Sequence, residues 1–238
     1  MGYIRELLWP RRCPVCGEVA PWGEWICPEC RDRLPRVKEP RCKRCGLPIA
    51  EAEEEYCENC RERDRSFDDG VVGFRYNSPV VRNLILQAKD RNLRQYYDYP
   101  CALMAEIYRE RIRRFLPECL IPVPLYPAKR RQRGFNQSEE IARRLSEAWG
   151  IPMRPEILRR IRATRDQKIL GTAGRAANVA GAFAVPPGVR APLRAALVDD
   201  VITTGATMDA CALALKKAGC RAVISVALTG SGGNLLES

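Results

Sequence analysis

Eight of the twelve cysteines lie before residue 61 and form four Cys-x-x-Cys pairs of identical spacing. Two thiolates three positions apart can bind one side of a zinc ion, and a second such pair completes a tetrahedral site. The chain contains no histidine, so such a site must use cysteine alone. We expect two structural zinc ions bound by sequential pairs, the first by Cys13, Cys16, Cys27 and Cys30 and the second by Cys42, Cys45, Cys57 and Cys60. A cross-braced arrangement of alternate pairs fits the spacing almost as well.

The first 65 residues contain too few large apolar side chains to fold without metal, so zinc is expected to supply folding free energy. We therefore predict a double zinc-ribbon-like module over 1–65 and a second domain over 66–238. Through Arg65 the chain has thirteen basic and thirteen acidic residues, so the net charge of +11 lies in the second domain. A neutral module lacks the attraction to phosphate that dominates nucleic-acid binding. Docking or partner binding is the favoured role of the module, ahead of direct contact with DNA.

A second segment combines a buried strand, two acids and a turn that contains glycine. Residues 195–202 are apolar apart from Asp199 and Asp200, and the turn 203–207 follows and begins a helix. The first turn of a helix offers unpaired backbone N–H groups and a partial positive charge, which suit a phosphate. The two carboxylates can accept hydrogen bonds from a ribose diol. An ordinary strand, turn and helix is the alternative, but two acids at a buried strand end are costly without a ligand.

This segment resembles the thirteen-residue motif of the phosphoribosyltransferases, which bind phosphoribosyl pyrophosphate. The resemblance implies that Asp199 and Asp200 hold the ribose hydroxyls. It implies that the 5-phosphate is bound by Thr203, Thr204, Gly205, Ala206 and Thr207. Ala206 stands where many members have serine, which removes one hydroxyl contact. In an active enzyme pyrophosphate would leave the anomeric carbon with magnesium bound to it, and the basic candidates to close over it are Arg130, Arg131 and Arg133.

Those arginines lie in a segment that resembles a single family. Residues 120–125 indicate a short strand leading into a basic, flexible loop over 126–132, after which Asn136 is a predicted helix cap. The runs Pro122-Val123-Pro124-Leu125 and Arg133-Gly134-Phe135-Asn136-Gln137 match the pattern of the ComF proteins, and the resemblance covers nearly the whole chain. These are competence-associated, phosphoribosyltransferase-like proteins with an N-terminal zinc module. The resemblance implies that the protein assists uptake or handling of transforming single-stranded DNA and has competence-machinery proteins as partners.

Alternating strand and helix patterns predict an α/β fold, of the type I phosphoribosyltransferase-like class, with a mainly parallel sheet flanked by helices. The predicted strands are 71–76, 120–123, 195–202 and 221–228, with short strands near Ile157 and over 179–183. The predicted helices are 79–88, 101–115, 138–149 and 207–218. No apolar run is long enough to span a membrane and no secretory signal is found, so we expect a cytoplasmic protein.

Three functions are compatible with these features. The first is a ComF-like factor that binds phosphoribosyl pyrophosphate or a nucleotide and assists uptake or handling of single-stranded DNA. The second is an active phosphoribosyltransferase in nucleobase salvage, since the acids and the phosphate turn are intact. The third is a zinc-bearing adaptor whose ligand site is only regulatory.

Overall fold

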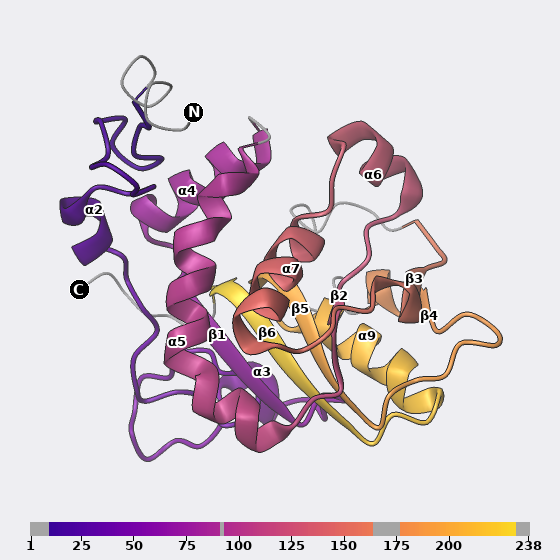
Figure 1. Ribbon diagram of the computed structural model, residues 1–238. Helices are drawn as coiled ribbons and strands as arrows, with labels where there is room; N and C mark the ends of the chain where they lie inside the picture. The colour runs from indigo at the N-terminus through magenta and orange to yellow at the C-terminus, as the bar shows by residue number, and fades with distance from the viewer. Residues whose placement is uncertain (1–9, 91–92, 164–176, 232–238) are drawn as a thin grey trace.

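A four-stranded parallel sheet forms the centre of the protein, as the alternating pattern predicts. The computed structural model describes residues 10–90, 93–163 and 177–231 (Figure 1). The strand order is β1-β6-β5-β2, with β1 at Asp69–Arg75, β2 at Cys119–Pro122, β5 at Arg194–Ile202 and β6 at Ala222–Gly230. In the register Asp199 pairs with Ala227 and Val201 with Thr229, while Pro122 pairs with Val198. The acids thus lie near the carboxyl ends of the two central strands, where α/β folds bind ligands.

The two faces of the sheet belong to two separate apolar clusters. In β5, Ala195 and Leu197 lie in one cluster, whereas Ala196 and Val198 lie in the other. This division follows from the two-residue period of a strand. Both faces are buried, so the continuous apolar run of β5 is the pattern expected of a central parallel strand.

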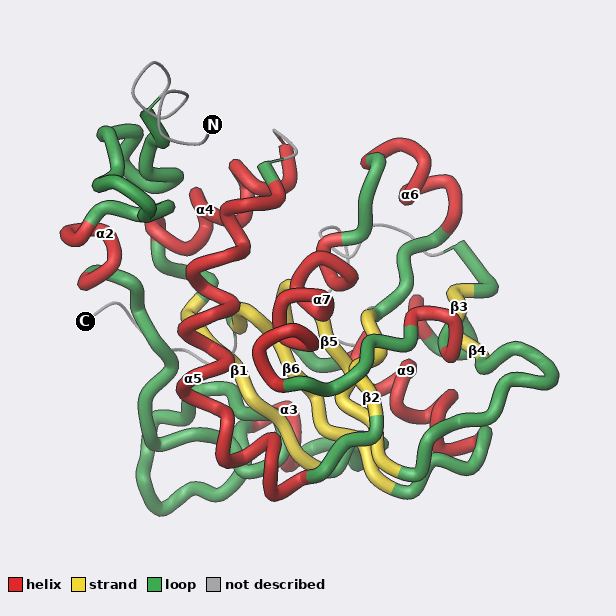
Figure 2. Tube along the Cα trace, in the orientation of Figure 1, coloured by secondary structure: helices red, strands yellow, loops and turns green. Residues whose placement is uncertain are grey.

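Helices cover both faces (Figures 1 and 2). One face is covered by α4 at Pro79–Asp90, the 3-10 turn η1 at Arg94–Tyr97, α5 at Asp98–Phe115 and α7 at Gln137–Trp149. The other face is covered by α9, at Ala206–Lys217. Helix α7 begins where predicted, because the Asn136 side chain accepts a hydrogen bond from the Ser138 backbone N–H (3.1 Å). None of the helices in the described ranges is long and apolar enough to cross a membrane.

The cysteine-rich segment contributes to both faces of the sheet. It contains the short helices α2 at Pro28–Asp32 and α3 at Glu58–Arg61. Buried residues of its first half, such as Cys13 and Ile26, join the cluster of α4 and α5. Those of its second half, such as Cys42 and Leu47, join the cluster of α9. The buried residues of the two ribbons therefore belong to the apolar clusters on opposite sides of one sheet.

Three predictions of local structure differ from what the structure shows. The basic segment expected to be a loop is helix α6, Pro127–Arg133, which starts at a proline and ends at Gly134 with φ of +77°. Near Ile157 the chain forms the 3-10 turn η2, Pro155–Ile157, and the strand expected over 179–183 is reduced to Phe183–Ala184 (β4), which pairs with Arg159–Arg160 (β3). Such short segments carry too few residues for an alternation pattern to identify.

Candidate functional site

Asp199 lies close to the predicted phosphate turn. Asp199, Val201, Ile202 and the whole turn from Thr203 to Thr207 line one cavity. Asp200 is not among its lining residues, because successive side chains of a strand point to opposite faces. The Asp200 backbone carbonyl instead accepts a hydrogen bond from Thr229 Oγ1 (2.8 Å). The structure thus brings the first acid together with the turn and directs the second acid away from that cavity.

Among the described residues, the Asp199 carboxylate has polar neighbours but no basic partner. Its Oδ1 accepts hydrogen bonds from Ser138 Oγ (2.8 Å) and from the Asp200 backbone N–H (2.9 Å). Burial, and next the nearby charge of Asp200, raise its pKa well above the usual value, whereas the Ser138 hydroxyl opposes that shift. Within the described residues, no lysine or arginine forms an ion pair with either aspartate. The carboxylates therefore retain acceptor capacity for ligand hydroxyls.

The turn itself has the geometry of an anion-binding helix start. Gly205 adopts φ of +75° and precedes α9, so its left-handed conformation favours glycine. Thr204 is buried, whereas Thr203 and Thr207 are half-buried. The first N–H groups of a helix have no partner within it, so residues 206–208 present donors beside the cavity. This arrangement can hold a phosphate group.

Helix α6 follows β2, the neighbour of β5, and projects beyond the carboxyl edge of the sheet (Figure 1). Arg130 forms a two-pronged ion pair with Glu139 of α7, through Nη1–Oε1 and Nη2–Oε2 distances of 2.7 and 3.0 Å. Arg131 is exposed to solvent. The side chain of Arg133 lies outside the described part of the structure. Neither Arg130 nor Arg131 lines the cavity of Asp199, so the structure does not bring these arginines into that cavity.

Sequence reasoning did not identify two residues that contact the site. Ser138 donates to Asp199 across 61 positions of sequence, and Arg65 Nη2 donates to the Thr204 carbonyl (2.7 Å) across 139 positions. The sequence indicates a helix cap at Asn136 and a ComF-like run that ends at Gln137, but gives Ser138 no role; its position after β2 is the available signal. Arg65 had no such signal, because a single arginine in a charged segment has no distinguishing pattern.

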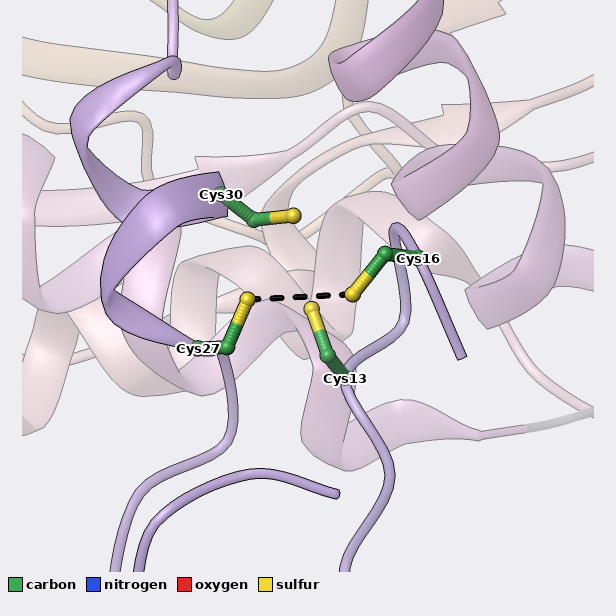
Figure 3. Close-up of side chains that lie close together, drawn as sticks. All are labelled: Cys13, Cys16, Cys27 and Cys30. Atoms are coloured by element: carbon green, nitrogen blue, oxygen red, sulfur yellow. Dashed lines mark hydrogen bonds between the residues drawn. The ribbon is translucent and has the colours of Figure 1, made fainter. Parts of the chain in front are cut away.

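The eight cysteines form two compact clusters with the sequential pairing. In each cluster the four sulfur atoms lie within 4.8 Å of one another: Cys13, Cys16, Cys27 and Cys30 in the first, and Cys42, Cys45, Cys57 and Cys60 in the second. The sulfurs of the first cluster converge on a common centre (Figure 3). The Cys16–Cys27 and Cys45–Cys57 sulfur distances are 3.7 and 3.6 Å. Four ligands about 2.3 Å from a tetrahedral zinc ion would lie about 3.8 Å apart, so both clusters fit structural zinc.

The two ribbons are built alike. Gly17 and Gly46 follow the first pair of each cluster with φ of +80° and +76°, a conformation that favours glycine. Each second pair begins a short helix, because Cys27 and Cys57 occupy the N-cap positions of α2 and α3. The cross-braced alternative is therefore excluded, and each zinc ion would be held within one ribbon.

Elemental analysis of the purified chain is expected to return about two zinc ions per molecule, because both four-thiolate clusters are complete. Inductively coupled plasma mass spectrometry on protein of known concentration checks this. Cys16→Ser, which removes one ligand of the first cluster, should lower this value by about one ion. A parent value near one would mean that one cluster does not bind zinc.

Comparisons with known proteins agree with this arrangement. Residues 4–61 match the family model of the double zinc ribbon domain. Competence protein F of Haemophilus influenzae is 30% identical over 215 residues, which cover 87% of this chain and 92% of that protein. DNA utilization protein YhgH of Escherichia coli strain K12 is 30% identical over 218 residues, covering 90% and 94%. Competence protein ComFC of Streptococcus pneumoniae is 24% identical over 208 residues, covering 85% and 86%. The similarity includes both the cysteine-rich segment and the α/β region.

Proposed function

Because the chain belongs to the ComF family of competence proteins, we propose that it assists the uptake or handling of transforming single-stranded DNA and that its domain 66–238 binds phosphoribosyl pyrophosphate or a nucleotide. The relatives are named for competence and for DNA utilization, which supports the first half of the proposal. The shared cavity of Asp199 and the turn 203–207 supports the second half and is the observation that carries it.

The proposed roles follow from the positions of these groups. Asp199 accepts a hydrogen bond from one ribose hydroxyl. Asp200 accepts a hydrogen bond from the neighbouring hydroxyl when the ribose lies across the carboxyl end of β5. The backbone N–H groups and hydroxyls of Thr203 to Thr207 bind the 5-phosphate. Arg130, Arg131 and Arg133 close over the pyrophosphate from α6, and for this Arg130 exchanges Glu139 for a phosphate oxygen. Magnesium, when bound with the ligand, neutralises pyrophosphate charge.

Isothermal titration of the full chain with phosphoribosyl pyrophosphate tests the ligand. Saturable binding at one site per chain is expected with magnesium, and a much weaker response when magnesium is left out. Zinc analysis after the titration confirms that the metal was retained. Absence of binding to this ligand and to nucleoside monophosphates in the presence of magnesium would contradict the proposed site.

An active phosphoribosyltransferase is the second candidate, favoured by one observation. A pair of acids that kept only a structural role would be expected to have a basic partner. Among the described residues, no basic side chain forms an ion pair with Asp199 or Asp200. Steady release of pyrophosphate from phosphoribosyl pyrophosphate upon addition of a nucleobase would establish this activity. If phosphoribosyl pyrophosphate binds but no purine or pyrimidine base causes release of pyrophosphate, the ligand would have a regulatory role instead.

Charge reversal on α6 is expected to weaken binding of single-stranded DNA. The double variant Arg130→Glu, Arg131→Glu should bind a single-stranded oligonucleotide at least about tenfold more weakly. The slope of the logarithm of the binding constant against the logarithm of the salt concentration should become shallower by about 1.4, since each lost phosphate contact removes about 0.7. Fluorescence anisotropy over a series of salt concentrations measures both quantities.

The matched control reverses two exposed arginines on α5, Arg109 and Arg113, which lie away from α6. This variant has the same net charge as the α6 variant. Equal weakening in the two variants would show that overall charge, and not α6, accounts for the binding.

A further inference from the structure

Arg65 connects the second zinc ribbon to the phosphate turn. Its Nη2 donates to two backbone carbonyls, those of Asn59 (2.8 Å) and Thr204 (2.7 Å). Asn59 lies in α3, between the zinc ligands Cys57 and Cys60, and Thr204 lies in the turn. One guanidinium group thus bridges a metal cluster and the candidate anion site, which are far apart in sequence.

The residues next to Arg65 add contacts to the same turn. The Ser66 backbone N–H donates to Asp209 Oδ1 in the first turn of α9 (2.6 Å). A Cβ atom at Gly205 would lie 3.6 Å from Phe67 Cζ and 3.7 Å from Arg65 Cζ, so both side chains pack directly against the turn. Phe67 is 1% exposed. Three consecutive residues therefore support the turn and the start of α9 from the ribbon side.

The second ribbon is in turn held firmly against the sheet. A Cβ at Gly46 would lie 2.6 Å from the Gly70 carbonyl oxygen, and a Cβ at Gly70 would lie 2.6 Å from the Cys45 carbonyl carbon. The ribbon and β1 can approach this closely only because both positions are glycine. Leu47 of the ribbon packs on Gly230 of β6. The ribbon is thus a fixed support from which Arg65 reaches the turn.

We propose that Arg65 is a positioning residue that orients the Thr204–Gly205 peptide for anion binding, an inference that rests on the proposed function of the turn. In a trans peptide the carbonyl and the following N–H point in opposite directions. With the Thr204 carbonyl held by Arg65, the Gly205 N–H points away from the Arg65 guanidinium, and Gly205 lines the cavity. The zinc-ordered ribbon therefore sets the orientation of a phosphate-binding donor.

Arg65→Met tests this, because methionine keeps an unbranched stem but removes every donor. Binding of phosphoribosyl pyrophosphate with magnesium is expected to weaken about tenfold, a change that corresponds to one hydrogen bond to a charged group. In the unliganded variant, amide hydrogen exchange of residues 205–207 should become at least several-fold faster. Arg65→Lys, which keeps a charge and a donor, should restore part of the affinity. Arg63→Met is the control, since within the described residues no hydrogen bond or ion pair joins Arg63 to the turn.

The two readouts separate the failure of this inference from that of the proposed function. If the parent does not bind the ligand, the function fails, and hydrogen exchange in the unliganded protein still tests the role of Arg65. The inference is overturned if Arg65→Met retains two zinc ions and the parental exchange rates at 205–207. It is also overturned if Arg63→Met changes exchange and affinity as much, because general destabilisation would then explain both.

Discussion

Asp199→Asn is expected to weaken the binding of phosphoribosyl pyrophosphate with magnesium by at least about tenfold, since a hydrogen bond to a charged group contributes about 1.5–3 kcal/mol. Asn keeps the size of the side chain and an oxygen that can accept from Ser138, so the loss would reflect the missing charge. Asp200→Asn should also bind more weakly. The larger loss is expected for Asp199, because only this acid shares the cavity with the turn. Titration calorimetry of the parent and both variants measures the difference.

The same substitution should make the unliganded protein more stable. The pKa of Asp199 is raised by burial and by Asp200, so the folded protein keeps this proton at pH values where the unfolded chain has lost it. The free energy of unfolding therefore falls as the pH rises from the unfolded pKa of about 3.9 through the folded pKa. Asp199→Asn has no such proton to lose, so above this window its melting temperature should exceed that of the parent. Thermal unfolding between pH 4 and 8 measures this.

Opposite effects on binding and stability are the signature of a ligand site. A merely structural carboxylate would lower stability when replaced and would leave binding unchanged. Asp64→Asn is the matched control, because Asp64 is exposed, and it should alter neither property. Parental affinity in both Asp199→Asn and Asp200→Asn would remove the basis of the proposed sugar-phosphate site.

Loss of the second zinc cluster is expected to unfold the whole chain, whereas loss of the first should be tolerated by the α/β region. Cys42 is 0% exposed, and with Cys45 and Cys60 it belongs to the same apolar cluster as Ile202 and Met208 around the site. Structural zinc in small ribbons contributes about 10–16 kcal/mol, comparable to the 5–15 kcal/mol total stability of a typical domain. Cys42→Ser should therefore abolish the cooperative unfolding transition.

Cys16→Ser provides the comparison, because Cys16 is the exposed ligand of the first cluster. This variant should lose one zinc ion but keep a cooperative transition and the binding of phosphoribosyl pyrophosphate. Circular dichroism melts, together with zinc analysis of the same samples, check both variants. Equal loss of structure in the two variants would show that both ribbons stabilise the sheet equally, which would contradict the expectation based on the deeper burial of the second cluster.

Sequence patterns identified the features whose chemistry is local. The Cys-x-x-Cys pairs predict zinc clusters because two ligands three positions apart necessarily lie close together. Asp199 and the turn after it are likewise consecutive, so strand, turn and helix follow from a few neighbouring residues. Helix α6 was wrongly expected to be a loop, since its basic residues were interpreted by charge, although Pro127 and Gly134 are ordinary signals of a helix start and end.

Alone, the sequence determined the four Cys-x-x-Cys pairs, the parallel α/β fold and the acidic strand end with its candidate phosphate turn, because each depends on spacing within a short stretch of chain. Only the tertiary structure decided how the cysteine pairs combine and that the buried residues of the two ribbons join the clusters on opposite faces of the sheet. It also decided that Ser138 and Arg65 contact the site. These contacts join residues 61 and 139 positions apart. They arise when separate elements pack together, and no local periodicity or spacing specifies which side chains then meet.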